Sequence, residues 1–237
     1  MTVDTKSGKK EKVRKMFNEI SYRYDFLNHF LSMGIDILWR KKLVDLLKKQ
    51  HPKYVLDVAT GTGDLAITAS RIEAIKIIGV DIAEEMLAVG RKKINQKKLD
   101  HKIELRLGDS ENLPFETGTF DAAIVAFGVR NFENLDKGLT EMYRVLSVKS
   151  KVYILEFSMP EKFPIRQLYH FYFKNILPLI GRVISKDRVA YTYLHDSVQE
   201  FPSGEAFLNR LNKAGFENAS QLKLSFGIAS IYVGEKA

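Results

Sequence analysis

The sequence predicts an α/β fold built on one mostly parallel sheet, with a helical cap before the sheet and an antiparallel hairpin at its end. Three patterns predict this fold. Short apolar runs alternate with helical stretches, a glycine-rich turn follows the first of these runs, and the C-terminal end reads as two strands joined by a tight turn. Strands separated by helices form parallel sheets through right-handed crossovers.

The N-terminal helical cap is predicted over residues 1–50. Between residues 12 and 50, apolar side chains recur three and four positions apart, which is the spacing of one face of a helix. Ser32 to Gly34 interrupts this pattern, so the sequence predicts at least two helices. The rest of the chain, residues 51–237, is expected to form the sheet domain, with a second cap segment inserted around residues 160–200.

The sheet itself is predicted from apolar runs of strand length, each followed by a helix or a turn. The expected parallel strands are 54–59, 76–81, 103–107, 120–126 and 152–157, with helices at 64–71, 84–96 and 135–146. A last helix at 203–214 leads into strands 220–225 and 229–233. Phe226 and Gly227 between those two strands suit a tight antiparallel connection.

The composition excludes several classes of chemistry. The chain has no cysteine, so it has no disulfide, thiolate nucleophile or cysteine zinc site, and its five histidines lack metal-binding spacing. No metal is therefore expected. The first residues form no apolar signal segment and no run is long enough to span a bilayer, which predicts a cytoplasmic protein. A net charge of +8 favours contact with anionic surfaces such as membrane head groups.

The most informative stretch is the turn from Asp57 to Asp64 (DVATGTGD), where the first strand is expected to lead into its helix. Gly61 and Gly63 let a ligand approach the backbone, and the helix N-terminus offers free N–H groups. The same glycines, with Asp81 at the end of the next strand, also satisfy the fingerprint of dinucleotide binding. The turn alone therefore leaves NAD(P) and S-adenosylmethionine both open.

The carboxylates around this turn favour S-adenosylmethionine. Asp57 and Asp64 would each repel a pyrophosphate charge about 4 Å away by roughly 4 kcal/mol, and they would attract the sulfonium and amino groups of S-adenosylmethionine. Asp64 also suits the first turn of a helix whatever is bound, because helix N-termini favour acids. Asp81 is placed to accept hydrogen bonds from both ribose hydroxyls. After the third strand, Asp109 is expected to accept from the adenine amine, and the Ser110 N–H to donate to an adenine ring nitrogen.

Several further stretches are distinctive in combination: DVATGTGDL, GVDIAEEML, GDSENLPF, AFGVRNF, MYRVL and LEFSMP. With them, the chain resembles the ubiquinone/menaquinone biosynthesis C-methyltransferase family from about Val13 to Gly234. The resemblance implies the class I methyltransferase fold, which has a Rossmann-like sheet. It also implies cofactor contacts at Thr62, Asp81, Asp109 and Ser110.

Two positions depart from the pattern of that family. Ala59 stands where many methyltransferases have the first glycine of the turn, which is tolerable if the position needs no positive φ. Ala126 stands where some members have a serine near the cofactor, so one hydrogen bond would be lost.

The resemblance implies methyl transfer from S-adenosylmethionine to a ring carbon of a prenylated quinol. Demethylmenaquinol is the expected acceptor, with the ubiquinone-precursor benzoquinol, a sterol or a small phenol as alternatives. Such a carbon is a weak nucleophile until the neighbouring hydroxyl loses its proton, so a base is needed. Arg130 is expected to stabilise the phenolate, and Asp25 or a water to take the proton. The other candidates are Tyr24, Asn28, Asn131 and Glu156, although Arg130 and Asn131 would otherwise only cap a loop and Tyr24 only fill the core.

The segment 163–184 (FPIRQLYHFYFKNILPLIGRVI) is rich in aromatic and aliphatic side chains. It is expected to cover an isoprenoid tail or lie at a membrane interface, or else to be buried in a homodimer or against the sheet. Reversible contact with an anionic bilayer is expected. Nucleic-acid binding is not, because neither an RNA-recognition strand motif nor a concentrated basic stripe is visible. An NAD(P)-dependent reductase and an RNA-associated module are the alternative functions.

Overall fold

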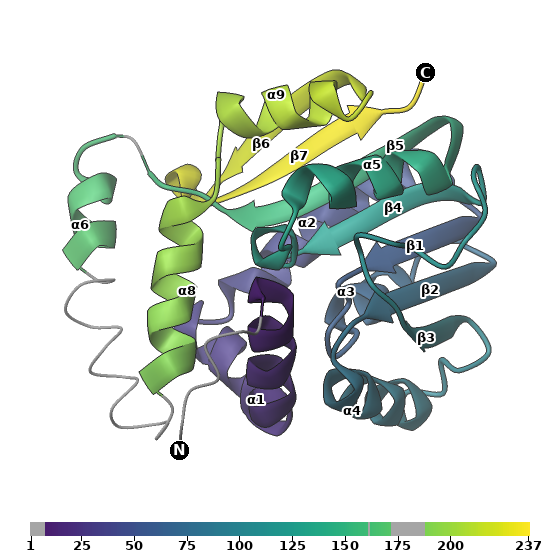
Figure 1. Cartoon of the computed structure of the whole chain (residues 1–237), viewed down its shortest axis with the longest axis horizontal. Coiled ribbons are helices and arrows are strands. Elements are labelled where there is room, and N and C mark those ends of the chain that lie inside the picture. Colours follow the sequence, from purple (N-terminus) through teal and green to yellow (C-terminus); the bar gives the residue numbers. More distant parts are fainter. Residues whose placement is uncertain (1–7, 161, 172–187) are drawn as a thin grey trace.

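The computed structural model describes residues 8–160, 162–171 and 188–237, and within them the backbone forms a seven-stranded sheet in the order β3-β2-β1-β4-β5-β7-β6 (Figure 1). Five strands are parallel: β1 (Tyr54–Val58), β2 (Lys76–Asp81), β3 (Ile103–Leu107), β4 (Phe120–Ala126) and β5 (Leu146–Phe157). The last two, β6 (Glu217–Leu224) and β7 (Ala229–Glu235), form an antiparallel hairpin whose β7 pairs with β5. The predicted fold class is confirmed.

Three strands, β5, β6 and β7, are longer than the sequence predicts, and β5 differs most. The expected strand at 152–157 begins at Leu146, because residues 146–151 also run beside β4. The pairing shifts register between Phe120 and Ala122, and Lys149 has a φ of +63°. Such an irregularity interrupts the alternation of side chains along a strand, which is the pattern that sequence reading depends on.

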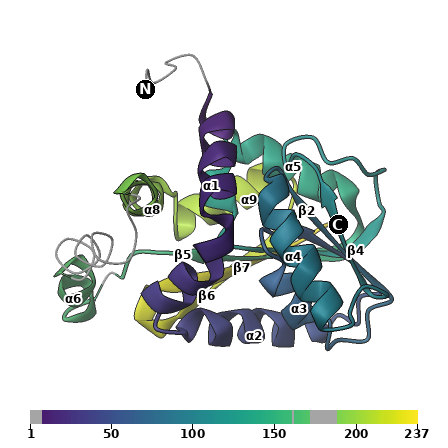
Figure 2. The same ribbon diagram turned by 90° about the horizontal axis from the view of Figure 1, so that it is seen from below.

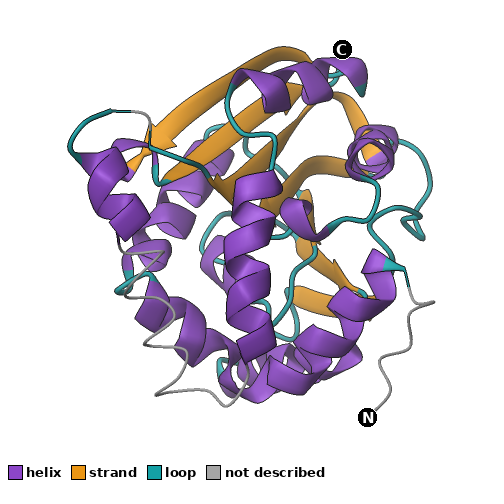
Figure 3. Cartoon of the chain, turned by 60° about the vertical axis from the view of Figure 1, so that its left-hand side comes forward, coloured by secondary structure: helices purple, strands orange, loops and turns teal. Residues whose placement is uncertain are grey.

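Helices cover both faces of the sheet (Figure 3). On one face, α2 (Ile35–Lys48), α3 (Asp64–Ala69) and α4 (Glu84–Gln96) enclose one apolar core. On the other face, α5 (Leu135–Val145) and α9 (Glu205–Lys213) enclose a second. Parallel strands covered on both faces read as nearly continuous apolar runs, which explains why the sequence shows them so clearly.

The N-terminal helix α1 (Lys9–Leu31) crosses the end of the sheet and packs beside α4 (Figure 2). The predicted break at Ser32 to Gly34 lies between α1 and α2, where Met33 and Gly34 have φ values of +51° and +74°. After β5 come α6 (Ile165–Phe171) and α8 (Arg188–Glu200). The apolar segment predicted at 163–184 lies outside the described residues from position 172 onward. None of the described helices is both long and apolar enough to cross a bilayer.

The strand order reverses between β1 and β4. From β1 the chain builds β2 and β3 to one side, and it then returns to place β4 and β5 on the other. Ligands of open α/β sheets bind at such a reversal, in the crevice at the carboxyl ends of the strands. The predicted site residues follow these same strand ends.

Candidate functional site

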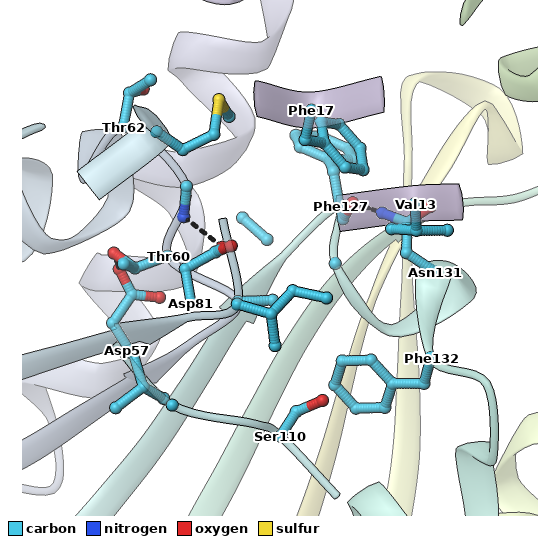
Figure 4. Close-up of a pocket in the computed structure, with 18 of the residues that line it drawn as sticks. Val13, Phe17, Asp57, Thr60, Thr62, Asp81, Ser110, Phe127, Asn131 and Phe132 are labelled. Carbon is cyan, nitrogen blue, oxygen red and sulfur yellow. Dashed lines mark hydrogen bonds between the residues drawn. The ribbon is translucent and has the colours of Figure 1, made fainter. Parts of the chain in front are cut away.

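A cavity of about 860 Å³, including the open space at its mouth, lies at the carboxyl ends of β1, β2 and β4 (Figure 4). Helix α1 covers the cavity with Lys10, Val13, Phe17 and Tyr24. Six of the predicted cofactor-binding residues line it: Asp57, Gly61, Thr62, Asp81, Asp109 and Ser110.

The glycine turn has the backbone that its composition predicts. Gly61 and Gly63 have φ values of +56° and +78°. Gly61 lines the cavity, whereas Gly63 precedes α3 as its N-cap and does not. Alanine would be tolerated at position 59 without cost only if the backbone there had a negative φ. Ala59 has a φ of +52°, so its backbone is strained. A left-handed backbone costs roughly 1–2 kcal/mol in an L-residue other than glycine.

Asp57 is a buried carboxylate at the end of β1, with only 1% of its surface exposed. One oxygen, Oδ2, accepts from the Thr60 hydroxyl at 2.6 Å and from the Ala66 N–H at 3.1 Å. The other, Oδ1, is buried without a hydrogen-bond partner among the described residues. Burial raises the pKa of Asp57 to about 7, although both hydrogen bonds oppose the rise. A buried acceptor of this kind calls for a donor from a ligand.

Asp81 is held by two backbone groups at the end of β2. Its oxygens accept from the Gly61 N–H at 2.8 Å and from the Ala83 N–H at 2.9 Å. Burial raises the pKa of this carboxyl against the effect of those bonds. Each carboxylate oxygen can accept more than one hydrogen bond. Asp81 is therefore fixed in place and retains the capacity to accept from two further hydroxyls.

Asp109 follows β3 and meets a residue that sequence reasoning missed. Its Oδ1 accepts from the Glu111 N–H at 2.9 Å, and its Oδ2 accepts from Lys10 Nζ at 2.8 Å. Lys10 also reaches the Glu111 carboxylate at 3.1 Å. Lys10 and Asp109 are 99 positions apart in the chain, so no local pattern could have paired them.

The arrangement of these groups fits S-adenosylmethionine. Its ammonium group would supply the donor that Asp57 Oδ1 lacks, and its ribose would supply hydroxyls to Asp81. A pyrophosphate offers only acceptors and negative charge toward the same two carboxylates, which is unfavourable in a site of low dielectric.

Asp25, one of the predicted catalytic residues, is engaged beside the cavity and does not line it. Its oxygens accept from the Thr62 hydroxyl at 2.5 Å and from Lys93 Nζ at 2.7 Å. Lys93 also pairs with Asp64. This network ties α1 to α3 and α4, so it fastens the helix that covers the cavity.

The remaining predicted catalytic residues separate into two groups. Tyr24 and Asn131 line the cavity, and the Tyr193 hydroxyl donates to Asn131 Oδ1 at 3.0 Å. Arg130 is not among the lining residues and is 9% exposed. Its guanidinium donates to Glu156 Oε1 at 2.8 Å and to the Phe127 carbonyl at 2.5 Å.

Comparison with known sequences assigns the chain to a family. A sequence profile of the ubiE/COQ5 methyltransferase family matches residues 5–236. The chain belongs to this family. Two relatives are named demethylmenaquinone methyltransferase. The one from Bacteroides fragilis is 45% identical over 97% of this chain and 94% of its own length. The one from Porphyromonas gingivalis is 44% identical over 98% of this chain and 96% of its own length. A Geotalea uraniireducens protein named ubiquinone/menaquinone biosynthesis C-methyltransferase UbiE is 44% identical over 96% of this chain and 97% of its own length.

Solved structures share the fold of this ubiE/COQ5 family member. A Thermotoga maritima protein described as an SAM-dependent methyltransferase superposes with a TM-score of 0.67 at 20% identity, covering 95% of this chain and 100% of that chain. Phosphoethanolamine N-methyltransferase 2 of Haemonchus contortus, solved with S-adenosyl-L-methionine, superposes with a TM-score of 0.62 at 15% identity. The match covers 93% of this chain and 60% of that chain. The predicted family, the predicted enzyme class and the predicted methyl donor, S-adenosylmethionine, are confirmed.

Proposed function

We propose that this methyltransferase transfers a methyl group from S-adenosylmethionine to a ring carbon of a prenylated quinol, and that the acceptor is demethylmenaquinol. The observation that carries the proposal is the gathering of Asp57, Asp81 and Asp109 around one cavity. The acceptor follows from two relatives named demethylmenaquinone methyltransferase. A ubiquinone-precursor benzoquinol is the second candidate, because a relative of equal identity carries the broader name.

The donor side of the cavity would hold S-adenosylmethionine. When bound, this molecule supplies an electrophilic methyl group on a positively charged sulfur. Asp57 would attract its ammonium group, and Asp81 would accept from its ribose hydroxyls. Asp109 and the Ser110 N–H would hold its adenine. Each of these groups is fixed to a strand end, so together they would hold the cofactor in one orientation.

The acceptor side of the cavity is aromatic. Phe17 of α1, with Phe127 and Phe132 after β4, forms its walls (Figure 4). Flat apolar walls suit the ring of a quinol and keep water from the reacting carbon. Tyr24 and Asn131 are polar groups on this side. Burial raises the pKa of Tyr24, so its hydroxyl keeps its proton and can donate to a ring oxygen.

Arg130 and Asp25 support this geometry from behind the cavity wall. The guanidinium of Arg130, paired with Glu156, donates to the Phe127 carbonyl and so holds the aromatic wall of the acceptor side in place. Because Asp25 is bonded to Thr62 and Lys93, a water in the cavity is the proton acceptor that the geometry favours. In this proposal Arg130 and Asp25 are positioning residues, while Tyr24 and Asn131 touch the acceptor.

The proposal includes reversible contact with the cytoplasmic face of a membrane. A prenylated quinol dissolves in the bilayer, and the enzyme must reach it there. The net charge of +8 favours approach to anionic head groups.

Methyl incorporation into quinols tests the proposal. The purified protein is incubated with radiolabelled S-adenosylmethionine and either demethylmenaquinol or its benzoquinol counterpart, and the products are extracted into organic solvent. Label in the naphthoquinol fraction is expected, whereas label only in the benzoquinol fraction selects the second candidate. Absence of label from both, with calorimetric binding of NADH and not of S-adenosylhomocysteine, would contradict the proposal in favour of a reductase.

A further inference from the structure

We propose that one edge of the molecule is a membrane-docking surface that binds an anionic bilayer. This docking edge consists of Met33, Ile37, Leu38 and Phe226, with the segment 162–171 that includes α6 beside them. The choice of a bilayer rests on the proposed function, because a prenylated acceptor resides in one.

Large apolar side chains gather at this edge. Met33 and Phe226 are 77% and 81% exposed, and Ile37 and Leu38 are 41% and 61% exposed. Helix α2 and the turn between β6 and β7, far apart in the sequence, meet here, because Trp39 Nε1 of α2 donates to Ser225 Oγ, beside Phe226, at 2.9 Å.

The segment around α6 extends the same edge. Figures 1 and 2 place α6 and the turn between β6 and β7 at the same end of the molecule. Phe163, Leu168 and Phe171 on this segment are between 59% and 81% exposed. Several large exposed apolar groups at one end of a protein mark an interaction surface.

Two of the most exposed of these side chains stand on unfavourable backbone. Met33 and Phe226 have φ values of +51° and +59°. A bulky residue in this region is an outlier, and glycine or asparagine would occupy it more readily. Because both side chains are exposed, burial in the core does not compensate for the strain. Strain of this kind at an exposed position points to a function of the side chain itself.

The charge at this edge selects an anionic partner. The described residues 33–42, 162–171 and 222–227 contain one carboxylate, Asp36. It is buried and paired with Arg40. The same described residues carry five exposed cations: Lys41, Lys42, Lys162, Arg166 and Lys223. Apolar groups rimmed by cations suit the interface of an anionic bilayer. A symmetric dimer through this edge would instead set these cations against their own copies.

A packed aromatic cluster lies between the docking edge and the cavity. Phe127 lines the cavity, and its ring centroid lies 4.5 Å from that of Phe157. Trp39 packs 6.1 Å from both rings. This aromatic cluster leads from the cavity wall to α2 and the Ser225 contact. The docking edge therefore lies on the Phe127 side of the cavity, which is the acceptor side.

Vesicle sedimentation tests the proposal. Wild type and the double variant Met33→Asn with Phe226→Asn are mixed with vesicles of phosphatidylglycerol and phosphatidylcholine, and with phosphatidylcholine alone. Asparagine accepts a positive φ, so the variant is expected to fold with an unchanged or higher Tm. Its partition onto the anionic vesicles is expected to fall at least tenfold. The matched control is Val148→Asn, a 65% exposed side chain near the amino end of β5, which should bind like wild type.

Three outcomes would overturn the docking edge: a double variant that binds as tightly as wild type, a control that loses as much, or a wild-type dimer in sedimentation equilibrium that the variant abolishes. A fourth arm separates this proposal from the proposed function. Wild type and the double variant should methylate a short-tailed, water-soluble quinol equally in the absence of vesicles. Failure of both in this arm counts against the proposed function, and the vesicle result still decides the docking edge.

Discussion

The two sides of the cavity are held in different ways. On the donor side, each carboxylate at the end of β1, β2 or β3 accepts a backbone N–H from a residue 2 to 20 positions away. On the acceptor side, side chains depend on remote segments. Arg130 pairs with Glu156, 26 positions away, and Asn131 is held by Tyr193, 62 positions away.

This difference separates the part of the site that is common to the fold from the part that is particular to this chain. Apart from the Lys10 contact to Asp109 and the Asp25 contact to Thr62, the donor side depends on backbone groups in short stretches of chain that many sheets of this fold can repeat. The acceptor side depends on how α1, α8 and the strand ends pack together. We therefore expect changes on the donor side to cost ligand binding, and changes on the acceptor side to cost folding as well as turnover.

The largest effect is expected from Arg130→Ala. It would leave Glu156, which is 0% exposed, without its ion-pair partner. Breaking a buried pair from one side lowers the free energy of unfolding by about 3–5 kcal/mol. Urea denaturation measures this. The double variant Arg130→Met with Glu156→Leu should recover most of the stability but not the turnover. If Arg130→Ala were as stable as wild type, the proposed distinction between the donor side and the acceptor side would fail.

A smaller effect, on binding alone, is expected from Asp81→Asn. The variant loses the charge that strengthens the hydrogen bonds to Asp81, so affinity for S-adenosylhomocysteine should fall roughly 100-fold, or about 3 kcal/mol. Isothermal titration calorimetry measures this, with the exposed Glu84→Gln as control. Unchanged affinity would take Asp81 out of the site. A large loss of stability would show that the donor side, too, is structural.

The raised pKa of Asp57 makes the donor side sensitive to pH. Because the folded pKa is about 7 and the usual value is 3.8, the stabilising contribution of the protonated form is complete below pH 3.8 and is lost as the pH rises through 7. The stability of wild type relative to Asp57→Asn should therefore fall over this window by up to about 1.4 kcal/mol per pH unit.

The same group should couple ligand binding to proton release. A ligand ammonium next to Asp57 favours the carboxylate, so binding of S-adenosylhomocysteine near pH 6 should release close to one proton. Calorimetry in two buffers of different ionisation enthalpy counts that proton. Asp57→Asn should release none, and equal release by both proteins would assign the proton to another group.

The smallest effect is expected from Ala59→Gly. Glycine removes the strain at a φ of +52° but adds freedom to the unfolded chain, so the net gain in unfolding free energy should be about 0.5 kcal/mol. Chemical denaturation measures this. The matched control is Ala69→Gly in α3, which should lose about 1 kcal/mol because its helical backbone gains nothing from glycine. A loss at both positions would mean that the turn is not strained.

The sequence by itself determined the sheet, the glycine turn and the three acids. Apolar periodicity and turn residues are local, and the carboxyl ends of parallel strands meet at one edge whatever else the chain does. Asp57, Asp81 and Asp109 could therefore be placed together from their positions after three strands. The helix break near Met33 was likewise readable from local composition.

Only the tertiary structure decided the partners of those residues. Lys10 on Asp109, Lys93 on Asp25 and Glu156 on Arg130 join positions 99, 68 and 26 apart. Their geometry follows from how helices and strands pack, and no spacing in the sequence encodes it. The same holds for the left-handed backbone of Ala59 and for the docking edge, because a backbone angle or a shared surface is set by the packed neighbours of a residue and not by its type.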